Sequence, residues 1–170
     1  MRIDSAGLPF IGGAVVLALL AGTAVAWALA LPFLVLGAFF LFFFRDPTRH
    51  VSAGGDDVVS PADGRVLVAG DGEAAAKPDG SWQQISIFLS PMDVHVNRVP
   101  VSGRITRVSY QPGTFLPAYH RHAAATNERS EIWIDHGGQT VVARQIVGVL
   151  ARRVVCRVAS GMEVRAGDRY

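Results

Sequence analysis

The stretch QISIFLSPMDVHVNRVPVSGRITRVSY, residues 84–110, decides the fold of this 170-residue chain. Three short runs rich in Val and Ile lie within it, at residues 84–89, 94–99 and 104–110. Ser90-Pro91 and Ser102-Gly103 separate these runs. β-Branched residues favour strands, and Pro and Gly mark the turns between them. The stretch therefore predicts three consecutive short β-strands.

Similar runs continue on both sides of this stretch. They lie at residues 65–69, 131–135, 140–147 and 153–158. Turn signals separate them, including Pro112-Gly113, Gly137-Gly138 and the Pro61-Ala62-Asp63-Gly64 turn, whose Asp63 is first of all a turn former. Seven short strands with this punctuation are typical of an antiparallel β-sandwich or a small barrel. We therefore expect a mainly β, sandwich-like or barrel-like domain.

Two stretches lack the pattern of strands. Residues 70–81 are small, polar and Gly-rich, which predicts an exposed loop. Residues 111–129 form a long connection with room for a short helix around 117–125. Its candidate binding side chains are Tyr119, His120 and His122. Long connections in compact domains are often functional, although a surface loop with chance histidines fits the same residues.

An uncharged apolar block, residues 8–44, precedes the β-like runs. A single helix of this length would measure roughly 55 Å, against about 30 Å for the hydrocarbon core of a bilayer. Pro32 and Gly22 offer breaks, so the block predicts a helical hairpin or a span followed by a shallow helix, with residues 31–44 in the second arm. A cleaved signal peptide is disfavoured because the block is too long and lacks a small-residue cleavage site. The expected domains are membrane-anchoring helices at 1–45 and a β-rich domain at 46–170.

Charged residues indicate the environment of the chain. Arg2 precedes the apolar block and Arg45 and Arg49 follow it, which favours a cell-membrane protein whose domain faces the cytoplasm. Cys156 is the only cysteine, so a disulfide within the chain is excluded. Residues 98–170 contain 11 basic and 5 acidic side chains, a net charge of +6. This charge suits anionic lipid headgroups or a solvated face without a partner, and we expect no nucleic-acid partner.

Residues 93–99 contain the densest group of candidate catalytic side chains. In an extended chain alternate residues share a face, so Asp93, His95 and Asn97 would lie together. His is suited to proton transfer near neutral pH, and an adjacent Asp can hold it in one tautomer or raise its pKa. A solvated edge strand without a site is the alternative.

Metal and pyridoxal chemistry find less support. Asp93, His95, His120 and His122 could supply ligands, but no two-His motif of established spacing is present, and we expect no metal. The single lysine, Lys77, lies in a predicted loop. A pyridoxal Schiff base needs a buried, oriented amine, so this lysine is a poor candidate.

Six motifs in order form a pattern that covers nearly the whole chain. They are Phe42-Phe43-Phe44-Arg45-Asp46-Pro47, Ser60-Pro61-Ala62-Asp63-Gly64, Leu89-Ser90-Pro91-Met92-Asp93-Val94-His95, Tyr110-Gln111-Pro112-Gly113, Asn127-Glu128-Arg129 and Gln145-Ile146-Val147-Gly148. Each motif is weak alone. Their order and spacing together resemble the short bacterial and archaeal type of phosphatidylserine decarboxylase, in its large (β) subunit.

This resemblance implies a proenzyme that cuts itself at a Gly-Ser bond near its C-terminus. The products would be the β subunit and a small α subunit, whose first residue becomes a pyruvoyl group, the cofactor. In that scheme the serine attacks the preceding carbonyl and the resulting ester undergoes elimination. The resemblance assigns Asp63 and His95 to assisting this reaction, and Asp93 matches the motif's own aspartate. These three are the candidate catalytic residues.

Two positions depart from the family pattern. Longer relatives have a second histidine three positions after the first, where this chain has Arg98, so His95 is expected to serve both self-cleavage and turnover. The only Gly-Ser pair, Gly80-Ser81, is far upstream of the family's cleavage point. Residues 160–170 resemble the approach to that point. We therefore expect most of a β subunit, with the α subunit as its partner.

The expected reaction converts phosphatidylserine to phosphatidylethanolamine and CO2 at the membrane surface. Loss of CO2 leaves a carbanion that needs a carbonyl-type electron sink, which the pyruvoyl group would supply through an imine with the serine amine of the lipid. We expect His95 to supply or relay a proton to the α-carbon. The candidate substrate-binding residues are Asn97, Arg98, Tyr119, His120 and His122, with Arg98 or the 119–129 loop at the lipid phosphate.

Other functions fit parts of the pattern. A membrane-tethered β-sandwich that binds a partner without catalysis would need neither His95 nor a second chain. A metal-dependent hydrolase would use the histidines and would be sensitive to chelators. Decarboxylation of a soluble amino acid is disfavoured, because the apolar block suits a lipid substrate that stays at the interface. Self-association into a homo-oligomer is left open.

Overall fold

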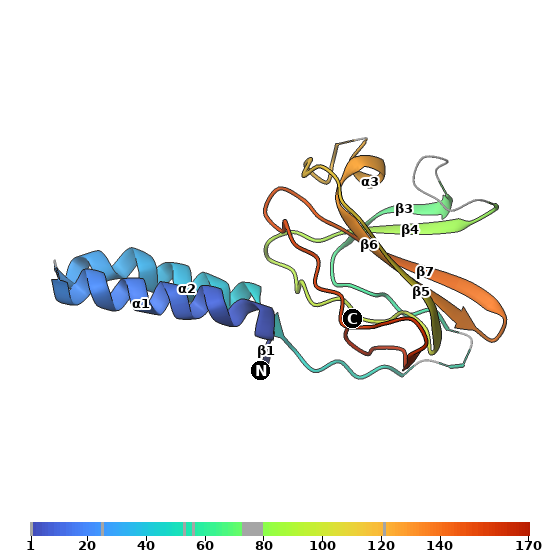
Figure 1. The fold of residues 1–170 in the computed structure, drawn as a ribbon, viewed down its shortest axis with the longest axis horizontal. Helices are drawn as coiled ribbons and strands as arrows, with labels where there is room; N and C mark the ends of the chain where they lie inside the picture. The colour runs from blue at the N-terminus through green and yellow to red at the C-terminus, as the bar shows by residue number, and fades with distance from the viewer. Residues whose placement is uncertain (1, 25, 53, 56, 73–79, 121) are drawn as a thin grey trace. The chain divides into compact units, whose positions relative to one another are not determined.

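The computed structural model describes residues 2–24, 26–52, 54–55, 57–72, 80–120 and 122–170. They form two compact units. The helical unit consists of Met1–Arg49 and Leu89–Val96, and the β unit consists of His50–Phe88 and Asn97–Tyr170. Figure 1 shows two long helices in the first and long, curved antiparallel strands in the second. The predicted mainly β fold with an N-terminal helical hairpin is confirmed.

The helical unit is an antiparallel pair of apolar helices. Helix α1 (Leu8–Ala24) follows a short 3-10 turn, η1 (Ser5–Gly7), and α2 (Leu31–Phe43) follows a second one, η2 (Trp27–Ala30). The hairpin turns just before Pro32, which lies in the first turn of α2, where its missing N–H costs nothing. Strand β1 (Arg2–Ile3) pairs with β2 (Arg45–Asp46), so the two ends of the hairpin meet.

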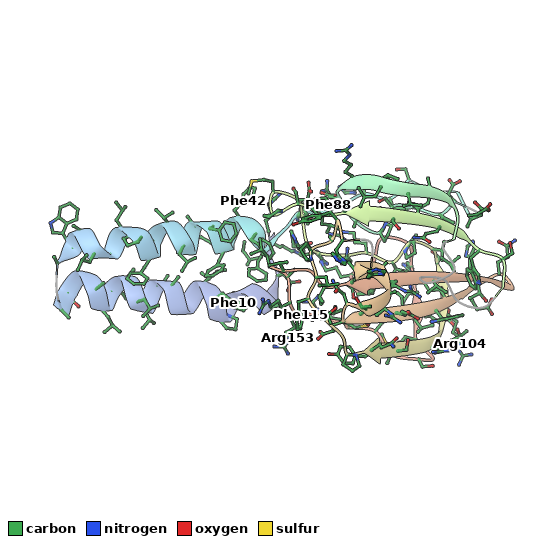
Figure 2. All side chains as sticks on the ribbon, turned by 90° about the horizontal axis from the view of Figure 1, so that it is seen from above. Phe10, Phe42, Phe88, Arg104, Phe115 and Arg153 are labelled. Carbon is green, nitrogen blue, oxygen red and sulfur yellow. The ribbon has the colours of Figure 1, made fainter. Side chains whose placement is uncertain are left out.

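Small residues line the contact between the two helices. Ala14 and Ala18 of α1 are buried, and Gly37 of α2 faces Ala14, which lets the backbones approach closely. The larger side chains point outward, as Figure 2 shows, and Leu19 and Leu31 are 62% and 63% exposed. The helix Ser5–Ala24 is long and apolar enough to cross a membrane, by length and composition.

The main sheet of the β unit has four antiparallel strands. They are β5 (Gly103–Gln111), β6 (Arg129–His136), β7 (Gln139–Ile146) and β8 (Glu163–Val164), in the order β7-β6-β5-β8. The β5–β6 register shifts between Ile105 and Arg107, a bulge that bends the sheet. The buried core consists of Val99, Val101, Ile105, Ile132, Ile134, Ala143, Val164 and Tyr170.

A separate hairpin, β3 (Arg65–Asp71) and β4 (Gln83–Phe88), completes the strands of the β unit. Trp82, at the start of this hairpin's second arm, meets Trp133 of β6 edge to face, with ring centroids 6.0 Å apart. Most of the predicted 70–81 loop, including Lys77, lies outside the described residues. The short helix expected around 117–125 is α3 (Ala123–Thr126), which begins later and is shorter than predicted.

Two predicted strands are wrong. Residues 94–99 are irregular and make a single bridge, from Arg98 to Arg169. Residues 153–158 pair with no strand among the described residues. Both stretches have the Val-rich composition of strands, but a strand also needs a partner of matching length. The two-residue strand β8, which the sequence did not indicate, pairs instead with the start of β5.

Candidate active site

His95 lies just after a tight turn in the helical unit. The Asp93 backbone N–H donates to the Ser90 carbonyl (2.9 Å), and the Ser90 N–H donates to the Asp93 carboxylate (2.7 Å). Hydrogen bonds to the carboxylate from the Ser90 side chain and from the Ser90 backbone N–H lower the pKa of Asp93, which stays a carboxylate. The carboxylate of Asp93 therefore shapes the turn that carries His95.

The imidazole of His95 is held in one tautomer. Its Nδ1 lies 3.0 Å from the backbone carbonyl of Asp93. A carbonyl can only accept, so Nδ1 must carry the proton and Nε2 has the free electron pair in the neutral ring. Burial lowers the pKa of His95, although the bond to the Asp93 carbonyl opposes this effect. Near neutral pH the ring is therefore uncharged and can accept a proton at Nε2.

The end of helix α2 contacts the same turn at two points. The Phe43 ring lies against the His95 ring, with centroids 4.1 Å apart and planes inclined by 32°. The Arg45 guanidinium donates to the Met92 carbonyl (2.6 Å) and to the Phe42 carbonyl (2.9 Å). The first and third motifs of the sequence pattern are thus brought together in the helical unit.

In the β unit, residues 97–100 lie between two other extended segments. On one side the Arg98 N–H donates to the Pro61 carbonyl (2.8 Å), beside the turn that holds Asp63. On the other side the Val99 N–H donates to the Asp168 carbonyl (2.8 Å), and the Tyr170 N–H donates to the Asn97 carbonyl (3.4 Å). The C-terminal residues therefore run antiparallel to the chain segment that follows His95.

Hydrogen bonds connect the remaining motifs, directly or through one another, to the segment of residues 97–100. Gln145 donates from Nε2 to the Asn97 side-chain oxygen (2.9 Å). The Val147 N–H donates to the Glu128 carbonyl (3.0 Å), and Glu128 is hydrogen-bonded to the Tyr110 side chain. Four motifs that are dispersed along the sequence from Ser60 to Gly148 thus meet in the β unit.

One buried acceptor at this centre is unused. The Gln145 Oε1 atom is buried and has no hydrogen-bond partner among the residues that the structure describes. A buried polar atom without a partner is costly, so such atoms in native proteins often mark a place where a further group binds. The Asn97–Gln145 pair therefore presents a polar position to a group that these residues do not supply.

Arg98 and Asp63 occupy defined positions in the β unit. The Arg98 guanidinium donates from Nη1 to the Gly167 carbonyl (2.9 Å), which ties the C-terminal segment to residues 97–99. Asp63 is half-buried in its predicted turn, and Gly64 follows it with a φ of +146°, where a Cβ would collide with the Phe88 carbonyl. The turn character of this motif agrees with its sequence, and the catalytic role of Asp63 stays a prediction.

The other candidate side chains lie in the loop before α3. Tyr119 is 87% exposed, and the rings of His120 and His122 have centroids 5.6 Å apart. Arg121, between the two histidines, is outside the described residues. No group of three His, Cys, Asp or Glu side chains suited to a metal ion occurs in the described part of the chain.

Sequence reasoning missed two residues of the site. Phe43 was part of a motif but was not expected to contact His95, and Gln145 was not expected to bond Asn97. Both belong to motifs of the family pattern, which was the available signal. The contacts themselves connect residues about 50 positions apart in each case, and local patterns do not reveal such pairs.

The imidazole of His95, with its proton fixed on Nδ1, is suited to accept and return a proton near neutral pH, which is the chemistry of a general base in an enzyme. Residues 36–170 match the family model described as phosphatidylserine decarboxylase. The chain therefore belongs to the phosphatidylserine decarboxylase family.

Individual relatives agree with this family. A protein from Nitrosomonas europaea, named phosphatidylserine decarboxylase proenzyme, is 41% identical over 165 residues, covering 96% of this chain and 76% of the relative. One of the same name from Solibacter usitatus is 40% identical over 174 residues, covering 99% and 79%. A third, from Chlorobium phaeobacteroides, is 43% identical over 137 residues, covering 79% and 63%. The word proenzyme in these names refers to a precursor that is processed.

Proposed function

We propose that this chain is the large subunit of a phosphatidylserine decarboxylase that acts at the membrane surface. The substrate is phosphatidylserine, and the products are phosphatidylethanolamine and CO2. A precursor first cuts itself into this subunit and a small partner that carries a pyruvoyl group. The observation that carries the proposal is the His95 imidazole, whose proton the Asp93 carbonyl fixes on Nδ1, in a chain whose residues 36–170 match the phosphatidylserine decarboxylase family model.

His95 is proposed to move the protons of both reactions. In self-cleavage its neutral Nε2 accepts the hydroxyl proton of the attacking serine. In turnover the α-carbon of the substrate loses CO2 and must gain a proton, and the protonated imidazole provides it. Burial lowers the pKa of His95, so its imidazolium form gives up a proton readily. Asp63 and Asp93 are the proposed assisting carboxylates.

The pyruvoyl group fits the polar position beside Asn97. When bound, a pyruvoyl group supplies the electron sink that decarboxylation requires. The Oε1 of Gln145 can only accept, so it would bind a donor such as the serine amine of the substrate, and the Asn97 amide nitrogen would donate to a carbonyl oxygen of the pyruvoyl group.

The lipid headgroup is proposed to bind to Asn97, Arg98, Tyr119, His120 and His122. Arg98 donates from Nη1 to the Gly167 carbonyl, and a guanidinium is the side-chain group that binds phosphate through paired hydrogen bonds. Tyr119 and the two histidines lie on an exposed loop, where a headgroup has access. Each of these residues is thus assigned to bind a polar atom of the lipid headgroup, and substitution of each residue tests its assignment.

The helix pair is proposed to anchor the enzyme, with its domain on the cytoplasmic side. Its outward side chains are apolar on all sides, and such a surface is stable in contact with lipid. The pairing of β1 with β2 brings Arg2 and Arg45 to the same end of the hairpin, which suits a cytoplasmic end rich in positive charge.

Decarboxylation can be measured on the full-length gene product in vesicles that contain phosphatidylserine labelled at the serine carboxyl group. The wild type should release labelled CO2, and His95→Gln should lower the rate by roughly 10²- to 10⁴-fold because proton transfer is lost. His136→Gln is a matched control, because His136 also bonds a carbonyl through Nδ1, that of Ser102. No CO2 from the wild type, or equal rates for wild type and His95→Gln, would contradict the proposal.

A further inference from the structure

The end of the apolar helix α2 lies against the candidate catalytic histidine. We propose that Phe43 is a positioning residue for His95, so that the helix pair takes part in the chemistry as well as in anchoring. This inference rests on the proposed function, which assigns proton transfer to His95. The contact between the two rings stands on its own geometry.

Two constraints act on different parts of the imidazole. The hydrogen bond from Nδ1 to the Asp93 carbonyl (3.0 Å) fixes one edge of the ring. The Phe43 ring covers one face, at 4.1 Å between centroids and 32° between planes. With one edge and one face fixed, the ring has little freedom to rotate, and Nε2 keeps a single direction. Proton transfer requires this, because a misplaced base loses much of its rate advantage.

Phe43 is itself held by aromatic neighbours. Its ring packs against Phe39 (5.8 Å) and meets Phe44 edge to face (5.1 Å, 78°). Phe44 stacks on Phe10 of α1 (5.6 Å), so the cluster connects both helices to His95. Gly7 makes room for this cluster, because a Cβ at its position would overlap the Phe44 ring. Figure 2 shows Phe10 and Phe42 at the same end of the helix pair.

Arg45, two residues after Phe43, also contacts the turn that carries His95. Its guanidinium donates to the Met92 carbonyl and lies 3.9 Å from the centroid of the Phe42 ring. Met92 belongs to the turn that carries His95. The end of α2 therefore fixes the backbone of the turn through Arg45 and the side chain of His95 through Phe43.

The charged groups around His95 explain why an apolar neighbour matters. Asp93 favours the protonated imidazole and Arg45 disfavours it, while burial disfavours it most. Phe43 contributes to this burial by keeping water from one face of the ring. Its removal should therefore let the pKa of His95 rise toward the ordinary value for histidine.

The test compares three variants of the full-length proenzyme in lipid nanodiscs. Phe43→Leu removes the ring while keeping an apolar side chain, and Phe43→Tyr keeps the ring. Phe33→Leu is the matched control, because Phe33 lies on the same helix and makes no ring contact with the aromatic cluster in the described part of the chain. We measure kcat, KM and the pKa of His95 by NMR of labelled histidine, assigned with His95→Gln.

Phe43→Leu should lower kcat roughly tenfold or more with little change in KM, and it should raise the pKa of His95. Phe43→Tyr should keep both at the wild-type values, and Phe33→Leu should change neither. An unchanged pKa and kcat in Phe43→Leu would overturn the inference, and so would equal losses in Phe43→Leu and Phe33→Leu. If the wild type forms no pyruvoyl group and releases no CO2, the proposed function fails, whereas the pKa comparison still decides whether Phe43 positions His95.

Discussion

At the scale of single residues, the proposed chemistry depends on the protonation state of His95. The neutral form, with the proton on Nδ1, is the one that the Asp93 carbonyl selects. Burial lowers the pKa of His95, so this form persists to more acidic pH than it would for an exposed histidine. Protonation of Nε2 as the pH falls through that pKa removes the acceptor for the serine proton.

The rate of self-cleavage should therefore fall on the acid side with an apparent pKa below the ordinary value of about 6.5 for histidine. The change is measured by following proenzyme processing between pH 4.5 and 8, with His136→Gln as the control. Above this pKa the rate should stay on a plateau, because the ring is already neutral. An acid limb that is centred above 6.5 would show that His95 is not desolvated in the working enzyme.

Arg98 shows how a residue can be located by its sequence motif without its contacts being foreseen. The motif placed it three positions after His95, where longer relatives have histidine, and its charge suggested a phosphate partner. In the structure its guanidinium also holds the Gly167 carbonyl, 69 residues away. The sequence shows which chemical group a side chain has. It does not show which backbone atom that group will bond, because this depends on the tertiary fold.

At the scale of elements, strands with regular partners were predictable and irregular ones were not. The runs at 65–69, 84–89, 104–110, 131–135 and 140–147 became β3 to β7 because antiparallel neighbours satisfy their backbone groups. Residues 94–99 have the same alternation of apolar residues, and Val94 and Val99 are buried. Their backbone bonds instead to short extended segments on both sides, an arrangement that composition does not indicate.

The side-chain amide of Asn127 holds the loop that precedes α3 in place. Asn127 is fully buried and bonds Thr114, both backbone groups of Leu116, and the Val147 carbonyl. It thereby joins the loop that carries Tyr119, His120 and His122 to the end of β7. The sequence indicated a functional motif at Asn127, but its structural role emerges only when these two segments meet.

Asn127→Ala should lower the free energy of unfolding by about 2–4 kcal/mol, because it leaves the buried Val147 carbonyl and the two half-buried backbone groups of Leu116 without these partners. Asn127→Asp should also destabilise the protein, since it replaces the amide donor with a second acceptor facing the Leu116 and Val147 carbonyls. The measurement is urea unfolding of the full-length protein in detergent. A loss below about 0.5 kcal/mol for Asn127→Ala would show that water replaces these bonds at little cost.

At the scale of the whole molecule, the described residues form an apolar helical unit and a β-rich unit. The predicted boundary after residue 45 stays a prediction, and the compact units differ from it in one instructive way. Residues Leu89–Val96 belong with the helices although they follow β4 in the chain. The segment that carries His95 is thus structurally part of the helical unit.

We expect the full-length gene product to be synthesised as one chain and to function as two chains, of which this chain is the larger. Intact mass spectrometry of the purified protein, with and without a carbonyl-reactive amine and a reducing agent, tests this most directly. We expect a large chain that includes residues 1–170 and a small chain whose blocked N-terminus gains the mass of the amine. A single uncut chain without a reactive carbonyl would contradict the account.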